Sequence, residues 1–189
     1  MIEKSIAMKD FVLPTELEKE ILNLATIYKR EAEKCLDAKA YLSGCVLTGA
    51  AMEAILLSFA NCFPEIIASA KCTPKKKGKI KSLNKWTFEN LLAVVKELNF
   101  LPSALSLEDE WSSVRAEIGD YVEVVRQIRN LIHPIRYAND FSRKRITKKY
   151  LETCFKIVET AIDYLYSYIT DSLKTMLIEK ERRSTQHRL

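Results

Sequence analysis

The stretch Leu42-Ser-Gly-Cys-Val-Leu-Thr-Gly-Ala-Ala-Met-Glu-Ala-Ile-Leu-Leu-Ser-Phe-Ala-Asn-Cys-Phe63 decides the fold, because its 22 residues contain one charged side chain, that of Glu53. A helix that is apolar nearly all round belongs in the centre of a helical bundle. The same length would suit a membrane span, but Gly44 and Asn61 dilute it, and a carboxylate at mid-bilayer is costly. We therefore expect a central helix over residues 41–62 and no membrane contact.

Amphipathic helices are predicted on both sides of this segment. Residues 14–40 repeat apolar side chains at three- and four-residue steps, and residues 87–98 begin a second such pattern. A long helix is expected over residues 107–133, ended by Pro134. Its apolar seam comprises Trp111, Val114, Ile118, Tyr121, Val125, Ile128 and Ile132. A final helix over residues 147–181 then closes the bundle.

The composition supports a single all-α domain. The chain has 189 residues, of which 48% are hydrophobic, so it can bury a full core. Four Gly and five Pro are too few for a turn-dense sandwich or barrel. We expect residues 1–189 to form one up-down bundle of four to five main helices. Leu173, Met176 and Leu177 are predicted on the inner face of the last helix, and residues 182–189 as a frayed tail.

Positive charge is concentrated in two regions of a chain whose formal net charge is +5. Residues 71–85 carry seven lysines and no acid, and residues 126–149 carry eight basic side chains and one acidic one. We expect the first region to be an exposed loop, which either guides an RNA backbone or is a solvated insertion. In the second region the residues expected to bind RNA are Arg136, Arg143, Lys144 and Arg145.

The five cysteines predict a reducing, cytoplasmic location. They are Cys35, Cys45, Cys62, Cys72 and Cys154, and they form no CxxC pair and no Cys/His cluster at metal-ligand spacing. Buried free thiols are expected at these positions. The first ten residues show no apolar core of a secretory signal. No metal and no cofactor are expected.

Candidate chemistry gathers around one of the two histidines. The sequence shows no Gly-rich phosphate loop, HExxH or GxSxG, and His187 lies in a polar tail. In contrast, His133 follows Arg126, Arg129 and Asn130 near the end of a predicted helix. The 3.6-residue period places these four side chains along one stripe next to the apolar seam.

This set of side chains suits metal-independent cleavage of RNA. An arginine binds phosphate through two parallel hydrogen bonds, and a histidine can move a proton to or from a ribose 2′-hydroxyl. Asn130 would orient a group, but the motif holds no second general acid or base. A second copy of the site, brought across a dimer, would supply it. The structural alternative is that His133 caps helix carbonyls and pairs with an acid such as Glu53.

The segment Arg129-Asn-Leu-Ile-His-Pro134, together with Leu47-Thr-Gly-Ala-Ala-Met-Glu-Ala-Ile-Leu56, resembles the HEPN superfamily. The hallmark of that family is an arginine, usually followed by a polar residue, and a histidine after four to six intervening positions. Arg129 carries the asparagine but has three residues before His133, whereas Arg126 has six. The arginine role is therefore open between the two. Glu53 is a candidate for the acidic group on the neighbouring helix, or a buried partner of either arginine.

The resemblance implies a four- or five-helix bundle that forms a homodimer with facing motifs. Many members are metal-independent endoribonucleases of defence and toxin–antitoxin systems, which makes RNA the implied substrate. Others are non-catalytic modules that dimerise and bind a nucleotide or a protein, such as an antitoxin of the nucleotidyltransferase type. A third hypothesis is an unrelated helical adaptor that assembles through its last helix. Exposure of His133 and the presence of a dimer would separate these three hypotheses.

Overall fold

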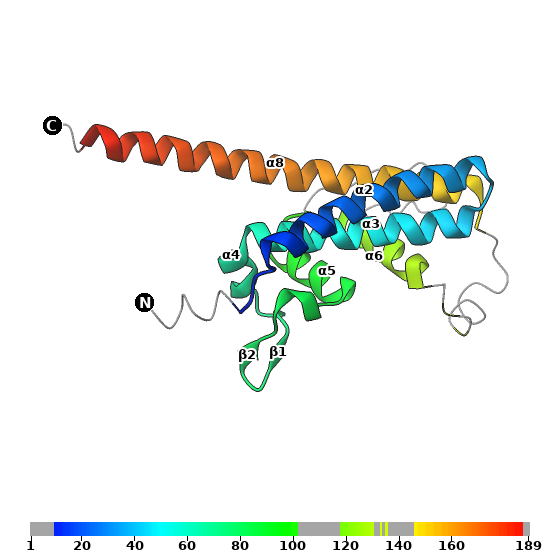
Figure 1. Cartoon of the computed structure of the whole chain (residues 1–189), viewed down its shortest axis with the longest axis horizontal. Coiled ribbons are helices and arrows are strands. Elements are labelled where there is room, and N and C mark those ends of the chain that lie inside the picture. Colours follow the sequence, from blue (N-terminus) through cyan, green and yellow to red (C-terminus); the bar gives the residue numbers. More distant parts are fainter. Residues whose placement is uncertain (1–9, 102–117, 131–132, 134, 136–145, 187–189) are drawn as a thin grey trace.

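The computed structural model of the chain describes residues 10–101, 118–130, 133, 135 and 146–186. The described helices are α2 (Thr15–Asp37), α3 (Tyr41–Cys62), α4 (Pro64–Ser69), η1 (Leu83–Lys85), α5 (Phe88–Glu97), α6 (Ile118–Arg129) and α8 (Lys148–Gln186). The described strands, β1 (Lys75–Lys76) and β2 (Lys79–Ile80), pair as an antiparallel hairpin. The predicted all-α helical bundle is confirmed (Figure 1).

The central helix is α3, as its apolar sequence predicts. It packs against α2, α5, α6 and α8, and ten of its 22 residues are buried. Among the described helices, α3 alone is long and apolar enough to cross a membrane, with a mean hydropathy of 1.7. Half of that apolar window is buried inside the protein, as in the core helix of a soluble protein. The structure is thus compatible with a soluble protein.

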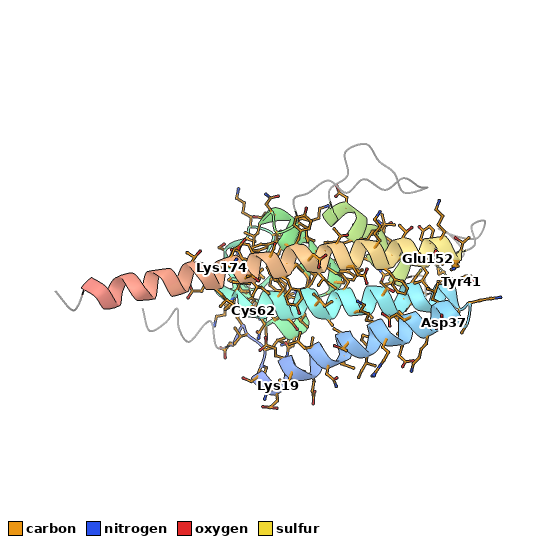
Figure 2. All side chains as sticks on the ribbon, turned by 90° about the horizontal axis from the view of Figure 1, so that it is seen from above. Lys19, Asp37, Tyr41, Cys62, Glu152 and Lys174 are labelled. Atoms are coloured by element: carbon orange, nitrogen blue, oxygen red, sulfur yellow. The ribbon has the colours of Figure 1, made fainter. Side chains whose placement is uncertain are left out.

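The three long helices lie side by side, with α2 antiparallel to both α3 and α8. Figure 2 shows this through the labelled ends: Lys19 lies near Cys62, while Asp37 lies near Tyr41. The connection from α2 to α3 is short because Lys39 adopts a φ of 57°, the left-handed conformation that ends many helices. On the other side of α3, helices α5 and α6 pack against it and against each other.

Two glycines of α3 determine how closely its neighbours approach. A Cβ atom at Gly44 would lie 2.5 Å from a methyl group of Leu151 on α8. A Cβ atom at Gly49 would lie 2.6 Å from the Cβ atom of Arg129 on α6. Both positions exclude a larger residue unless a helix moves, so the backbone of α3 meets both helices directly. Gly49 thereby sets the position of the C-terminal end of α6.

The core lies where α3, α5, α6 and α8 meet. Its largest fully buried side chains are Phe88, Met52, Leu56, Ile67, Leu83, Leu91, Leu92, Leu101, Leu151 and Ile157. At one end an aromatic cluster fastens α8 to α3, with the rings of Phe100 and Tyr168 centred 4.6 Å apart in an edge-on arrangement. Phe59 and Phe63, at the end of α3, complete this cluster. Burying these large apolar side chains is the main stabilising contribution to the bundle.

Helix α8 is longer than the sequence predicts. Its backbone is helical to Gln186, whereas a frayed tail was expected from residue 182 onward. The stretch contains no Gly or Pro, and Glu179 precedes Arg183 by one turn, which supports a helix. Leu173 is 55% exposed, so its predicted place on the inner face is wrong: α8 has by then passed the end of the other helices (Figure 1).

Two further predictions on α8 and the tail remain outside the described part of the structure. The side chains of Met176 and Leu177, predicted on the inner face of the last helix, are not among those described. The same holds for residues 187–189 of the predicted tail.

Helix α6 ends earlier than predicted. It stops at Arg129, Asn130 forms a tight turn, and His133 follows outside the helix. Pro at position 134 disfavours the helical conformation for the residue before it, His133, but does not by itself account for an end at Arg129. Val125 of the predicted seam is fully buried, and so is Val122, which the seam omits. The other seam positions, Trp111, Val114, Ile118, Tyr121, Ile128 and Ile132, lie outside the residues or side chains that the structure describes.

The lysine-rich region is a hairpin rather than a loop. Residues 71–85 form β1, β2 and η1, and Thr73 and Leu83 at the base are buried. A two-residue turn makes this possible, because both Lys77 and Gly78 have positive φ values. The lysines themselves are mostly exposed, as expected.

The cysteines only partly follow the prediction of buried thiols. Cys45 and Cys154 are buried, with their Sγ atoms 3.8 Å apart between α3 and α8. Cys62 and Cys72 are exposed, so burial was wrong for these two. Cys62 ends the central helix and Cys72 precedes the hairpin, positions where the chain turns toward the surface.

Candidate functional site

A polar pocket lies where the end of α6 meets the start of α5. Its volume is ≈ 280 Å³, and it is lined by Thr87, Phe88, Glu89, Arg126, Arg129, Asn130 and His133. Every side chain that the sequence singled out as catalytic, namely Arg126, Arg129, Asn130 and His133, is therefore brought to one place. The residues contributed by α5 were not predicted.

Helix α5 presents its N-terminus to this pocket. Thr87 is the N-cap: its hydroxyl accepts a hydrogen bond from the Asn90 backbone N–H at 3.3 Å. The Asn90 side-chain oxygen in turn accepts a hydrogen bond from the Thr87 backbone N–H at 3.2 Å. This reciprocal cap fixes the start of the helix, and Phe88, which is buried, anchors it in the core. The positive end of the helix dipole therefore faces the pocket.

Arg126 is held by a carboxylate of its own helix. Its Nε and Nη2 atoms donate to the two carboxylate oxygens of Glu123 at 2.8 and 2.5 Å. The hydrogen bonds to Glu123 raise the pKa of Arg126, and those from Arg126 lower the pKa of Glu123. Glu89 approaches from α5, with its Oε2 atom 3.9 Å from Nη1 of Arg126. The guanidinium is thus fixed in orientation while one of its edges points toward α5.

Arg129 is held by the central helix. Its Nη2 atom donates to Oε2 of Glu53 at 2.6 Å, and its Nη1 atom donates to Oδ1 of Asn130 at 3.4 Å. Both side chains of the Arg129–Glu53 pair are half-buried. The suggestion that Glu53 partners one of the two arginines is confirmed, and Arg129 is that arginine. This pair joins α6 to α3 close to the contact made by Gly49.

His133 is the exposed member of the group. Its backbone N–H donates to the carbonyl oxygen of Asn130 at 3.1 Å, which turns the chain back beside the end of α6. The residue is exposed and lines the same pocket as the two arginines. The carboxylate of Glu53, offered as a partner for His133, is hydrogen-bonded to Arg129 instead.

The chemistry available here is anion binding and proton transfer. A guanidinium carries five N–H donors, so the two that Arg126 gives to Glu123 leave donors for a phosphate. An imidazole near neutral pH accepts or donates a proton. In the described residues, no group of three or more His, Cys, Asp or Glu side chains could hold a metal ion.

The outcome of the sequence predictions is uneven across the site. Arg136, Arg143, Lys144 and Arg145, expected to bind RNA, lie outside the described residues. Glu123 was missed, although its position one turn before Arg126 on a helix is a recognisable signal. No sequence pattern indicated Thr87 and Glu89 as pocket residues, because only the packing of α5 against α6 brings them there.

Comparisons of the chain with protein-family models, with curated proteins and with solved structures give no match. Function is therefore inferred from the pocket.

Proposed function

We propose that this chain is a HEPN-like, metal-independent endoribonuclease that acts in defence or as a toxin. The observation that carries the proposal is the pocket itself, where an exposed His133 shares one cavity with Arg126, Arg129 and Asn130. The number of residues before His133 does not decide which arginine takes the family's role, but both guanidiniums line the same cavity. Either can reach a phosphate placed there.

The proposed reaction is an internal transesterification of RNA. The ribose 2′-oxygen attacks the adjacent phosphorus, the bond from phosphorus to the 5′-oxygen breaks, and the products are a 2′,3′-cyclic phosphate and a 5′-hydroxyl. His133 takes the 2′-hydroxyl proton, and the guanidiniums of Arg126 and Arg129 stabilise the charge that develops on the phosphoryl oxygens. Asn130 orients the attacking or leaving group.

The leaving 5′-oxygen requires a proton donor, and a single histidine serves one role at a time. We assign the second role to His133 of another copy of the chain, so that two pockets face each other across a homodimer. Such a dimer also doubles the local guanidinium charge. A composite site of this kind has a direct consequence: a heterodimer of wild type and His133→Ala lacks one of the two histidines and is inactive.

A second candidate function is favoured by one observation. Both arginines already hold a carboxylate, Glu123 for Arg126 and Glu53 for Arg129, and these carboxylates compete with a phosphate. This arrangement supports a non-catalytic HEPN-like module that dimerises and binds a nucleotide or a protein, such as a nucleotidyltransferase-type antitoxin. In that case the main role of Arg129 is to join α6 to α3.

The deciding experiment incubates the purified protein with total RNA in EDTA. Wild type is compared with His133→Ala and Arg129→Ala, and with Arg30→Ala as a control that removes an exposed arginine of α2. Cleavage that leaves cyclic phosphate ends, is lost in both pocket variants and persists in the control supports the nuclease. If no sample cleaves RNA and light scattering shows a dimer, the result supports the binding module.

The composite site has its own test. His133→Ala is refolded together with wild type in increasing proportion, and each heterodimer then lacks one of the two histidines that the proposal requires. Cleavage that falls more steeply than the wild-type fraction supports facing pockets. Cleavage that falls in simple proportion to the wild-type fraction, when the variant still dimerises with wild type, contradicts a shared site.

A further inference from the structure

The hairpin carries an unusual density of positive charge on a rigid support. Five lysines are exposed on or beside it, namely Lys75, Lys76, Lys77, Lys79 and Lys85. Within the described residues, none of the five forms an ion pair, and residues 71–85 contain no acid. We define the lysine hairpin as residues 75–81. Figure 1 shows it projecting from the bundle, away from the long helices.

Two features of the lysine hairpin are unfavourable for the hairpin itself. Lys76 is paired directly opposite Lys79 across the strands, and like charges in that position destabilise a hairpin. Lys77 occupies the first turn position with a φ of 52°, where Asn, Asp or Gly is preferred. Sequences break local rules in this way mainly at functional sites. An anion bound by the side chains of Lys76 and Lys79 would relieve the repulsion between them.

The base of the lysine hairpin is fixed at both legs. On the first leg, the carboxylate of Glu97 accepts hydrogen bonds from the backbone N–H groups of Lys71 and Cys72 at 2.7 and 2.8 Å. On the second leg, the indole N–H of Trp86 donates to the carbonyl oxygen of Lys81 at 2.9 Å. Trp86 is itself buried against Phe11. A fixed base lowers the ordering cost of binding.

The lysine hairpin is connected to the pocket through a short stretch of chain. Lys85 is exposed and lies two residues before Thr87, which lines the pocket. Positive charge therefore runs from the hairpin to the N-terminus of α5, where the helix dipole continues it. Lys85 thus supplies one positive charge between the hairpin and the pocket, where the exposed carboxylate of Glu89 also lies.

We propose that the lysine hairpin binds the sugar-phosphate backbone of RNA, by charge and without reading sequence. The choice of RNA as the polyanion rests on the proposed function. An anionic membrane is disfavoured, because Ile80, the one apolar side chain of the lysine hairpin, is partly buried against the core, and the other hairpin residues offer none to insert into lipid. Base stacking on the hairpin is not expected either, since Trp86 is buried at its base.

The test measures binding separately from cleavage. A fluorescein-labelled single-stranded RNA of mixed sequence is titrated by anisotropy in EDTA, using the His133→Ala protein so that the probe survives. The hairpin variant replaces four lysines by glutamine, at Lys75, Lys76, Lys77 and Lys79. The control makes the same change at Lys19, Lys34, Lys156 and Lys174, which are exposed on α2 and α8, so that net charge is matched. Thermal melting checks that both variants fold.

We expect affinity to fall about fivefold at 0.1 M salt for each RNA phosphate that the variant no longer neutralises, and the slope of log affinity against log salt to shrink by ~0.7 per phosphate. The control variant should retain wild-type binding, and arginine at the four hairpin positions should restore it. Equal weakening in hairpin and control variants overturns the proposal. Binding of the hairpin to phosphatidylserine vesicles, without an effect on RNA, overturns the choice of polyanion.

The outcomes for the two proposals are distinguishable. Loss of RNA binding in the hairpin variant, when wild type cleaves nothing, leaves the hairpin proposal standing and removes the nuclease. If wild type cleaves RNA without metal but the hairpin variant binds RNA like the control, the nuclease proposal stands and the hairpin proposal is removed.

Discussion

The pocket and the lysine hairpin both present cationic side chains, but under different constraints. In the pocket, Arg126 and Arg129 each bind a carboxylate, and both guanidiniums are held in place by these pairs. In the hairpin, Lys75, Lys76 and Lys77 pair with no acid among the described residues. Paired charge is oriented but partly neutralised, whereas unpaired charge acts over a Debye length of ~10 Å at 0.1 M salt. The pocket is thus suited to position a phosphate, and the hairpin to attract a polyanion.

This difference predicts that the two regions affect separate kinetic steps. His133→Ala should lower kcat for RNA cleavage by about 10²–10⁴-fold, because proton transfer is lost. The four-lysine glutamine variant of the hairpin should raise KM and leave kcat within about twofold, because it removes binding shared by substrate and transition state. Steady-state cleavage of a fluorogenic RNA measures both constants. A hairpin variant with reduced kcat at saturating RNA would show that the two regions are not separate.

Gly49→Ala should disturb the pocket without touching its polar groups. The added methyl would lie 2.6 Å from the Cβ atom of Arg129, so α6 must shift away from α3. Overpacking of this kind costs about 1–3 kcal/mol of unfolding free energy. Denaturant unfolding measures the loss, and Ser43→Ala, on an exposed position of the same helix, is the control. RNA binding by the hairpin should survive, since the hydrogen bonds at its base involve neither α3 nor α6.

The Glu123 carboxylate should make the stability of the pocket depend on pH. Hydrogen bonds from Arg126 hold the pKa of Glu123 below its ordinary value of 4.5. A lowered folded-state pKa means that the pair stabilises the protein above the unfolded value, and that this stabilisation is lost as pH falls through the folded value. Glu123→Gln should therefore lower Tm by about 1–3 °C at neutral pH, as an ion pair open to solvent on one side allows.

The measurement of Tm against pH must extend to acid pH and include a control variant. Once the pH has fallen below the lowered pKa of Glu123, wild type and Glu123→Gln should approach the same Tm, because the carboxyl becomes protonated in wild type as well. Glu20→Gln, an exposed position on α2, should leave the curve unchanged. A difference between wild type and Glu123→Gln that is the same at both pH values would contradict an ionic role for this pair.

The smallest expected effect is a gain in stability in the hairpin. Lys77→Asn places a residue that tolerates positive φ at the first turn position and removes one lysine from a repulsive cluster. We expect a stabilisation of about 0.5 kcal/mol and an RNA affinity lowered about fivefold. Lys79→Asn is the matched control: it removes the same charge from a strand position, where asparagine is disfavoured. A hairpin in which both changes strengthen RNA binding would contradict the proposed charge contact.

The sequence predicted most of the helices because their apolar periodicity is local information. Residues 41–62 were expected as the central helix, and α3 spans Tyr41–Cys62. The grouping of Arg126, Arg129, Asn130 and His133 was predicted from the spacing of a helix face. The two arginines do lie on α6, whereas Asn130 and His133 reach the same pocket from beyond its end. Glu53 was one predicted partner of either arginine, and it pairs with Arg129.

Other features could not be predicted from the sequence, for identifiable reasons. The hairpin was expected as a loop, because two-residue strands show no alternation and the turn uses lysine instead of asparagine. The exposure of Leu173 depends on where the other helices stop, which periodicity along α8 does not encode. The early end of α6 shows that a proline indicates a helix end only to within about a turn.

The local pattern of apolar and charged side chains was enough to establish the helical class, the central helix and the pair of arginines at the end of α6, because each depends on spacing along one element. Tertiary packing alone decided that α5 brings Thr87 and Glu89 to those arginines, and that Glu53 pairs with Arg129 and not with Arg126. The physical reason is the close approach of α6 to α3 at Gly49, where a single missing side chain sets the distance between two helices.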